Sequence, residues 1–452
     1  MSESVKLKLK SFRRGVHPEE FKSLTCDSSS RELPLPDEVF IPLQQHIGAP
    51  CKALVEKGDH VKTGQKIADT EAFVSSPIHA SITGKVLAVG SFPHPLGGKV
   101  PMVRIKRGGE GDDWELIKVP DSWQSAPRDE LHRIVREAGI VGLGGAAFPT
   151  HVKMSPPKDK PVDHFILNGC ECEPFLTCDH RSMLEDTDQI LQGMAIMMKL
   201  LDIKQGIIGI ESNKANAISQ MESRVKALGL DFVVQPLKVK YPQGAEKMLI
   251  DAALGRKVPA GGLPMDVGVV VNNIATALAV YEAVVNGKAL IQRKLTVTGD
   301  AISSPGNLLV RIGSSFQSCV DACGGLRNDA AQVFMGGPMM GMAQYDLSVP
   351  TLKATSGIVC LESSQLSKLK HYPCIQCGTC VGVCPMNLIP TRISRLAETA
   401  QYDECKDWGV FNCIECGSCA FVCPSGIPLV QWIRLGKVKV TENQNKLKAK
   451  AV

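Results

Sequence analysis

One run of cysteines occurs twice in this chain and restricts its fold more than any other feature. Residues 374–385 read CIQCGTCVGVCP and residues 413–424 read CIECGSCAFVCP, so eight of the twelve aligned positions are identical. Both runs follow the spacing C-x₂-C-x₂-C-x₃-C-P. Because only two residues separate each of the first three cysteines, the chain must loop tightly around a common centre. The repeat therefore predicts a duplicated domain built around two inorganic centres.

The spacing of each run is that of bacterial two-cluster ferredoxins, in which the fourth cysteine of one run ligates the cluster of the other. We therefore predict a helical domain with two [4Fe–4S] clusters. Two zinc sites are disfavoured, because zinc motifs pair two C-x₂-C arms across a spacer and lack the further cysteines and the proline. The predicted ligands are Cys374, Cys377, Cys380 and Cys423 for one cluster, and Cys413, Cys416, Cys419 and Cys384 for the other.

The remaining cysteines show no metal-like spacing. The first residues, MSESV, lack the positive region and apolar core of a signal peptide, so we expect a reducing compartment and no disulfides. Three of these cysteines, Cys170, Cys172 and Cys178, lie in or near an acidic loop. The others are predicted to be small buried side chains: Cys26, Cys51, Cys319, Cys323, Cys360 and Cys405.

Charge and hydropathy argue against two classes of protein. The chain has 51 Lys and Arg against 46 Asp and Glu, which gives no sign of the basic face that nucleic acid requires. No run of about 18 apolar residues occurs, so we expect no membrane-spanning helix. The basic stretches at 6–10 and 446–450 lie at the ends, where we expect solvated, frayed chain.

The first segment, residues 1–125, is rich in short strands broken by turns. This pattern predicts a small sandwich or barrel, and it resembles the barrel-sandwich fold of biotinyl and lipoyl carrier domains. The hairpin tip at 69–72 reads DTEA and has no lysine to hold a swinging arm. We therefore expect a barrel-sandwich domain without carrier function.

Residues 126–290 alternate helical and strand patterns, which predicts an α/β domain with a largely parallel sheet. The predicted strands are near 165–167, 207–210, 232–234 and 267–271, and the predicted helices near 130–139, 245–254 and 276–285. Residues 291–360 return to short strands around one helix at 316–323. The rest is predicted as a ferredoxin domain at 361–440 and a basic tail at 441–452. The fold class is multidomain, α/β plus β.

Two loops of the α/β segment point to a ligand site. Residues 142–150, GLGGAAFPT, follow a helix and so are not a dinucleotide fingerprint, which opens a helix after a strand. Taken alone, this glycine-rich loop is either a helix cap with a turn or a ligand loop. Residues 168–174, NGCECEP, directly follow a strand, where ligands of open α/β sheets bind. The structural alternative is that the two glutamates of this acidic loop only solvate it.

These loops resemble the flavin-binding G-R-G-G-A-G-F-P-T and N-A-D-E-G-E-P motifs of the NADH-oxidising subunit of respiratory complex I. Residues 241–247, YPQGAEK, and 271–276, VNNIAT, resemble two further motifs of that subunit, in the same order. This chain departs at Leu143, where that subunit has arginine, and at Cys170, where it has aspartate. It also lacks the aromatic residues expected after 256–259.

The order of segments along the whole chain, including FRRGVHP at 12–18 and PLQQHIGAP at 42–50, resembles the C subunit of the Rnf electron-transport complex. That family implies a peripheral subunit on the cytoplasmic face of a membrane-bound, ion-translocating ferredoxin:NAD⁺ oxidoreductase. It also implies non-covalent FMN, NAD(H) as substrate and two [4Fe–4S] clusters. The 291–360 segment resembles the β-grasp, or SLBB-like, module found beside flavin sites. The implied partners are the membrane subunits and the ferredoxin-like B subunit of the complex, with no nucleic acid.

The resemblance also implies site residues, but no catalytic acid or base, because the cofactors supply the chemistry. Glycine amides and a lysine suit phosphate, and asparagines suit ribityl hydroxyls and ring edges. The residues implied for FMN are Gly142, Gly144, Gly145, Lys153, Asn168, Glu171, Asn272, Asn273 and Thr276. Those implied beside NADH are Phe148, Glu173 and Glu246.

Two other functions are kept as alternatives. A cobalamin reductase has similar flavin and cluster motifs, and the amino-terminal segment and the domain order disfavour it. A two-cluster electron relay without flavin activity is the non-enzymatic alternative. The glycine-rich loop and the Asn272-Asn273 pair argue against it.

Overall fold

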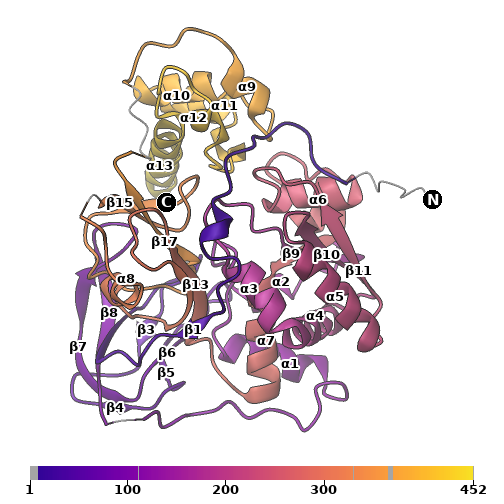
Figure 1. The fold of residues 1–452 in the computed structure, drawn as a ribbon, viewed down its shortest axis with the longest axis vertical. Coiled ribbons are helices and arrows are strands. Elements are labelled where there is room, and N and C mark those ends of the chain that lie inside the picture. The colour runs from indigo at the N-terminus through magenta and orange to yellow at the C-terminus, as the bar shows by residue number, and fades with distance from the viewer. Residues whose placement is uncertain (1–8, 110, 329, 365–369, 451–452) are drawn as a thin grey trace.

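The computed structural model describes residues 9–109, 111–328, 330–364 and 370–450, arranged as three β-containing parts and a helical end (Figure 1). Residues 6–8 of the predicted basic amino-terminal stretch, and residues 451–452 of the predicted basic tail, lie outside the described residues. The predicted fold class is confirmed: parallel and antiparallel sheets are combined with a helical carboxyl-terminal part. The predicted boundaries between the five segments stay predictions.

The barrel consists of two small antiparallel sheets that share one core. The first sheet has the order β2 (Glu38–Pro42), β8 (Lys99–Arg107), β7 (Gly84–Pro93) and β4 (His60–Val61). The second consists of β3 (Lys52–Ala53), β5 (Lys66–Asp69) and β6 (Ile78–His79). Alternating apolar residues from both sheets, such as Val39, Ile67 and Val103, fill the space between them.

The α/β part has a fully parallel sheet in the order β11 (Phe232–Leu237), β10 (Gln205–Glu211), β9 (His164–Gly169) and β12 (Val269–Asn273). Separate apolar cores lie against it. Its α-helices are α1 (Arg128–Glu137), α2 (Thr150–Lys153), α3 (Cys178–Glu185), α4 (Thr187–Leu201), α5 (Ala215–Ala227), α6 (Glu246–Leu254) and α7 (Ile274–Asn286).

One predicted strand of this part begins later than its apolar run. Residues 267–271 were expected to be extended, but Val267 ends the short 3₁₀ helix η2 (Pro264–Val267) and the strand starts at Val269. Pro264 suits the first position of such a helix, because it lacks the amide hydrogen that this position leaves unbonded. The local turn therefore takes precedence over the apolar pattern.

The third sheet has six strands and one packed helix, α8 (Phe316–Ala322). Its order is β1 (Arg31–Glu32), β14 (Gly306–Arg311), β13 (Gln292–Thr298), β17 (Gly357–Glu362), β15 (Ala330–Met335) and β16 (Met342–Gln344). Strand β1 pairs in parallel with β14. The amino-terminal segment that precedes the barrel strands therefore forms part of the third sheet.

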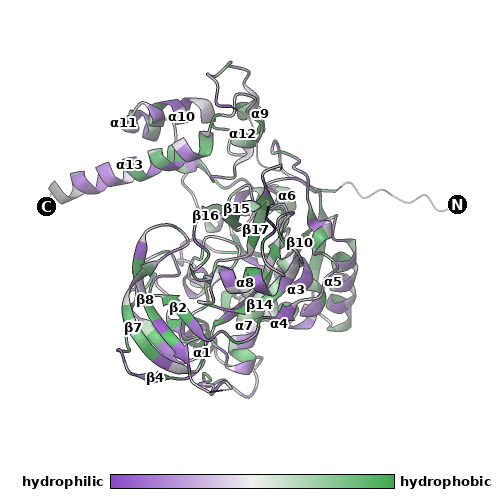
Figure 2. Ribbon diagram, turned by 60° about the vertical axis from the view of Figure 1, so that its left-hand side comes forward, coloured by the Kyte–Doolittle hydropathy of each residue, from purple (hydrophilic) through white to green (hydrophobic). Residues whose placement is uncertain are grey.

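The carboxyl-terminal part is helical. Figure 2 shows α13 (Leu429–Lys450) running away from the body of the molecule and becoming mostly hydrophilic toward its end. Residues 446–450, expected to fray, continue this helix. Among the described residues, no helix combines the length and the apolar character needed to cross a membrane. The shorter elements are α9 (Thr379–Val383), α10 (Pro390–Glu398), α11 (Tyr402–Asp407), η3 (Val410–Asn412) and α12 (Ser418–Phe421).

Candidate cofactor sites

The register of two neighbouring strands brings the predicted motifs together. Asn273, at the end of β12, pairs with Asn168, near the end of β9. Since parallel strands end at one edge of a sheet, the acidic loop after β9 and the start of α7 after β12 share that edge. The side chain of Asn273 caps α7 by accepting a 2.8 Å hydrogen bond from the amide of Ala275. This edge, with the start of α7, is the candidate flavin site.

The glycine-rich loop lies against this helix start. The amide of Gly142 donates to the carbonyl of Phe148 at 2.8 Å and closes the loop, and the amide of Leu143 donates to Oγ1 of Thr276 at 2.9 Å. A Cβ on Gly144 would stand 3.1 Å from that of Asn273. At Gly145 φ is +132°, a conformation that L side chains rarely adopt. Three of the predicted glycines thus form one loop at the amino end of α7.

Lys153 and the segment after Tyr241 complete the same edge. Nζ of Lys153 donates to Oε1 of Glu246 and to the carbonyl of Val271, both at 2.7 Å. Nδ2 of Asn168 donates to the carbonyl of Gly244 at 2.8 Å. The four motifs are far apart in the sequence, and the structure joins them through backbone and side-chain hydrogen bonds.

Glu171 holds the start of α3. Its carboxylate accepts hydrogen bonds from the amides of Asp179 at 2.7 Å and His180 at 3.1 Å. A carboxylate is favoured there, because the amino end of a helix has unpaired amide groups and a partial positive charge. This contact gives Glu171 a structural role in addition to the one implied by its motif.

Asp179 belongs to the site, although no sequence motif marks it. Its Oδ2 accepts a 2.6 Å hydrogen bond from Nδ2 of Asn273. Burial and, next, the nearby Glu171 carboxylate raise the pKa of Asp179 to about 7. The only signal in the sequence was an acidic residue in the first turn of a helix.

The residues present fit a flavin phosphate or ring edge. Asn272 is only 4% exposed, and within the described residues its side-chain Nδ2 donates to no acceptor. A buried donor without an acceptor costs about 1–3 kcal/mol, so the site calls for an acceptor from a ligand. Gly144, which packs against Asn273, and Gly145 are exposed and can offer backbone amides to a phosphate.

The three residues expected beside NADH fall in different places. Phe148 belongs to the glycine-rich loop, and Glu246 pairs with Lys153. Glu173 instead accepts hydrogen bonds from the amides of Met339 at 2.7 Å and Met340 at 3.1 Å, which lie in the connection between β15 and β16. Burial raises the pKa of Glu173. Its carboxylate therefore ties the acidic loop to the third sheet.

The cysteines around the acidic loop pack inside it. Sγ of Cys172 accepts a hydrogen bond from the amide of Gly244 at 3.2 Å, and Cys178 donates to the carbonyl of Ser356 at 3.3 Å. Burial raises the pKa of Cys170, Cys172 and Cys178, so these thiols stay protonated. Of the six cysteines expected to be small buried side chains, five are buried and Cys26 is half-buried.

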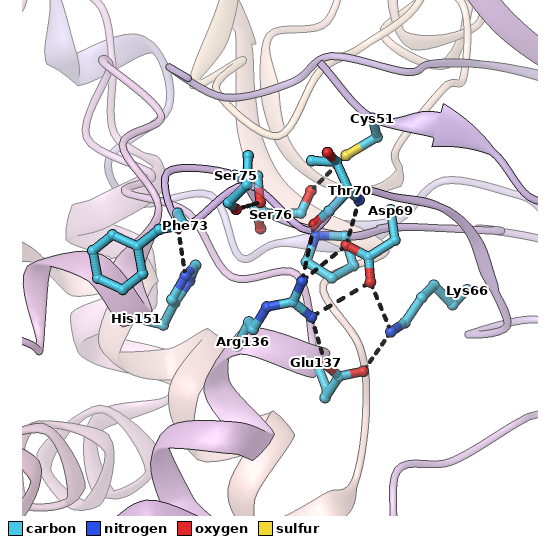
Figure 3. A network of polar contacts seen from close by, with 12 residues as sticks. Cys51, Lys66, Asp69, Thr70, Phe73, Ser75, Ser76, Arg136, Glu137 and His151 are labelled. Atoms are coloured by element: carbon cyan, nitrogen blue, oxygen red, sulfur yellow. Dashed lines mark hydrogen bonds and ion pairs between the residues drawn. The ribbon is translucent and has the colours of Figure 1, made fainter. Parts of the chain in front are cut away.

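The barrel is docked against α1 and α2, the helices on either side of the glycine-rich loop; Figure 3 shows the contacts of Arg136 and His151. Arg136 of α1 donates to Oδ1 of Asp69 at 3.1 Å and to the carbonyl of Thr70 at 3.2 Å. His151 of α2 lies 3.2 Å from the carbonyl oxygen of Phe73. The amide of Ile47 also donates to the carbonyl of Ala147, in the glycine-rich loop, at 3.3 Å. The hairpin tip that holds the lysine in carrier domains is here fixed to the α/β part.

The two cysteine runs are interleaved in space. Four thiols line one pocket, and they come from both runs: Cys413, Cys416 and Cys419 from the second and Cys384 from the first. Around the other predicted centre, Cys380 of the first run and Cys423 of the second lie in one apolar group. Four cysteine thiols around one cavity are the donor set of a [4Fe–4S] cluster, so the residues fit that group.

Four models of known protein families match successive parts of the chain. Residues 10–110 match the family described as RnfC barrel sandwich hybrid domain, and residues 135–282 the Nuo51 FMN-binding domain. Residues 294–343 match the SLBB domain, and residues 373–427 the 4Fe-4S dicluster domain.

Curated relatives match over nearly the whole chain. The C subunit of the proton-translocating ferredoxin:NAD(+) oxidoreductase complex of Clostridium ljungdahlii is 49% identical over 88% of this chain and 87% of its own length. The C subunit of the Na(+)-translocating complex of Acetobacterium woodii is 45% identical over 96% of this chain and 98% of its own. The C subunit of the ion-translocating oxidoreductase complex of Rhodobacter capsulatus is 42% identical over 96% and 84%.

A solved structure shares the fold. The H2-reduced NAD+-reducing [NiFe]-hydrogenase matches with a TM-score of 0.51 and 17% sequence identity, over 71% of this chain and 65% of that chain.

Proposed function

Since the chain belongs to the RnfC family, the C subunits of the ion-translocating ferredoxin:NAD(+) oxidoreductase complexes, we propose that it exchanges electrons between NAD(H), a bound FMN and two [4Fe–4S] clusters. It is then an oxidoreductase component that passes these electrons to other subunits of the complex. The observation that carries the proposal is the pocket lined by four cysteines from both runs, in a chain that also has an FMN-binding domain.

The flavin is proposed to lie at the edge formed by the glycine-rich loop and the start of α7. Gly142, Gly144, Gly145 and Lys153 would face its phosphate, and Asn168, Glu171, Asn272, Asn273 and Thr276 its ribityl chain and ring. When bound, FMN takes two electrons as a hydride and releases them singly, as iron–sulfur clusters require. The chain itself orients the flavin through its amides and amide side chains, and the docked barrel braces the loop.

The nicotinamide nucleotide is proposed to bind beside Phe148 and Glu246, on the glycine-rich loop side. Glu173 is also proposed to lie beside the nucleotide, because it is part of the NGCECEP motif at 168–174. Its hydrogen bonds to Met339 and Met340 support a role in holding the acidic loop in place. We propose the membrane subunits and the ferredoxin-like B subunit as partners, with the chain peripheral on the cytoplasmic face.

The flavin site is tested with Asn272→Leu in the full chain, purified anaerobically. If the unpaired amide of Asn272 serves the flavin, FMN binding weakens about tenfold, the equivalent of one hydrogen bond. Asn286→Leu, at the other end of α7, is the matched control and keeps the FMN affinity of the parent chain. Fluorescence titration with FMN measures the affinity, and circular dichroism checks the fold.

Two results would contradict the proposal. Equal FMN affinity of the parent chain and Asn272→Leu would remove Asn272 from the site. A parent chain that holds both clusters but binds no FMN, and that reduces no artificial acceptor with NADH, would favour the electron relay without flavin. Reduction of a corrinoid without association with membrane subunits would favour the cobalamin reductase.

A further inference from the structure

We infer that residues 10–16 form a strap that places one particular cluster next to the flavin, and that Arg14 is its positioning residue. The cluster next to the flavin is the one held by Cys384, Cys413, Cys416 and Cys419. The other cluster then passes electrons on to another redox protein; its ligands are Cys374, Cys377, Cys380 and Cys423. This inference rests on the proposed function and adds the order of the two clusters to it.

One face of the strap is bonded to the α/β part. The amide of Val16 donates to the carbonyl of Tyr241 at 2.8 Å, and the amide of Tyr241 donates back at 2.9 Å. Upstream, Nζ of Lys240 lies 4.6 Å from the ring centroid of Phe12, and Nζ of Lys10 donates to the carbonyl of Ala253 at 2.9 Å. The strap is thus attached along its length to the segment that contains the YPQGAEK motif.

The other face is bonded to the ferredoxin part. The amide of Gly15 donates to the carbonyl of Val383 at 3.0 Å. Nη1 of Arg14 donates to the carbonyls of Val381 at 3.1 Å and Cys384 at 3.5 Å. In Figure 1 the indigo amino-terminal segment passes between the yellow helices and the α/β part. Arg14 therefore binds the backbone at the end of the first cysteine run.

Glycine at position 15 makes this double contact possible. A Cβ there would stand 2.5 Å from the carbonyl oxygen of Tyr241, and φ is +87°. A strap with a larger residue at this position could not lie between Tyr241 and Val383 without moving one of them.

The buried contact between the two parts involves a predicted cluster ligand. Cys416 packs in one apolar group with Val16 and Tyr241, and Cys172 and Met339 contact this group. Cys172 accepts a hydrogen bond from Gly244, which in turn accepts one from Asn168 of the candidate flavin site. A continuous series of contacts therefore leads from Asn168 to Cys416.

A second connection runs through the third sheet. The carboxylate of Glu173 holds the amide of Met339 at 2.7 Å, and the carbonyl oxygen of Met339 would stand 2.5 Å from a Cβ on Gly417. Gly417 directly follows Cys416. The acidic loop and the second cysteine run are thus held together by the same short segment.

The other predicted centre faces outward. Cys374 and Cys377 are exposed, and so are their neighbours Tyr372 and Ile375, at 55% and 67%. An exposed cluster edge among apolar side chains suits contact with a second redox protein. Cys384, Cys413, Cys416 and Cys419 would hold the cluster that takes single electrons from the flavin, and Cys374, Cys377, Cys380 and Cys423 the cluster that passes them on, with no bond formed or broken.

The strap is tested with Arg14→Ala in the full holoprotein, with Arg13→Ala as the matched control because the side chain of Arg13 is exposed. We expect Arg14→Ala to keep its FMN, its iron and its rate of flavin reduction by NADH. In Arg14→Ala, electron transfer from the reduced flavin to the clusters becomes several-fold slower, as measured by stopped-flow absorbance. Hydrogen exchange becomes faster at residues 14–16 and 381–384. Arg13→Ala changes neither readout.

The order of the clusters is tested with Cys377→Ser and Cys416→Ser, with iron analysis and electron paramagnetic resonance of the dithionite-reduced protein to identify the remaining cluster. In Cys377→Ser the remaining cluster is still reduced rapidly by NADH through the flavin, whereas in Cys416→Ser it is not. The opposite pattern overturns the inferred order. If a ligand variant loses both clusters, the comparison of Arg14→Ala with Arg13→Ala decides whether the strap positions the cluster next to the flavin.

Failure of this inference differs from failure of the proposed function. Parent-like cluster reduction and hydrogen exchange in Arg14→Ala would overturn the strap while flavin reduction by NADH persists. A parent chain whose flavin is not reduced by NADH would instead contradict the proposed function.

Discussion

Lys353 lies where three parts of the molecule meet, and its ammonium group has almost no contact with water. Its side chain is 1% exposed, and Nζ donates to the carbonyls of Pro77 at 2.9 Å and Gly139 at 2.6 Å. Burial lowers its pKa from 10.5 to about 7. The barrel, the α/β part and the segment before β17 are thus joined at a lysine that loses its charge near neutral pH.

This residue predicts a pH dependence of stability. Between about pH 7 and 10.5 the unfolded chain binds more protons than the folded one, so the contribution of Lys353 to stability rises with pH over that range and is lost as pH falls back to 7. Lys353→Met removes this slope. The thermal midpoint of the variant minus that of the parent protein is therefore expected to be larger at pH 6 than at pH 9.

The control for this prediction is Lys62→Met, at a barrel lysine whose side chain is 53% exposed. Its midpoint relative to the parent protein changes little over the same pH range. Equal pH profiles for Lys353→Met and Lys62→Met would show that burial of Lys353 has no such effect.

At the scale of single elements, α4 and α7 pack closely because of one glycine. A Cβ on Gly193 of α4 would overlap the carbonyl oxygen of Ala277 in α7. Alanine is favoured over glycine inside a helix by about 1 kcal/mol, so helix propensity alone does not explain the glycine. The glycine is explained by the close approach of α7, which presents Asn273 and Thr276 to the candidate site.

Gly193→Ala is therefore expected to destabilise the α/β part, despite its gain in helix propensity. Overpacking of this kind costs about 1–3 kcal/mol. Denaturant unfolding followed by circular dichroism measures the loss, and Gln192→Ala, one residue earlier in α4, serves as control. A Gly193→Ala protein as stable as the Gln192→Ala protein would mean that α7 moves away without cost.

At the scale of the whole molecule, the ferredoxin part differs from the others in what holds it together. Its own apolar core is small, with Ile393, Leu396, Val410 and Ile433 among its members, and of the eight predicted cluster ligands only Cys413 packs against it. Small units of this kind usually depend on a metal centre, because a small core buries too little apolar surface. The parallel sheet, by contrast, has extensive cores of its own.

Removal of iron with a chelator should therefore act locally. Amide hydrogen exchange in residues 374–384 and 413–423 is expected to become fast, while exchange in β9 to β12 stays slow. Mass spectrometry of peptides before and after chelation provides both measurements. Unchanged protection of the cysteine loops in the iron-free protein would contradict a structural role of the clusters.

Much of the architecture could be predicted from local patterns. The predicted helices at 130–139, 245–254 and 316–323 correspond to α1, α6 and α8 within a few residues, because apolar periodicity reports the buried face of each helix. The late start of β12 could not be read from apolar residues alone. Asp179 also escaped prediction, because its place beside Asn273 depends on a contact across 94 residues.

The sequence by itself determined which groups are available for the chemistry: the cysteine spacing predicts two donor sets of four thiols, and the glycine and asparagine motifs predict a phosphate and flavin site. These are properties of short loops, whose geometry depends on a few neighbouring residues. The tertiary structure alone decided which cysteine run packs against the α/β part and how the barrel braces the glycine-rich loop. Arg14 and Val381 stand 367 residues apart. No local pattern encodes such a contact, because it forms only when separately folded parts are packed together.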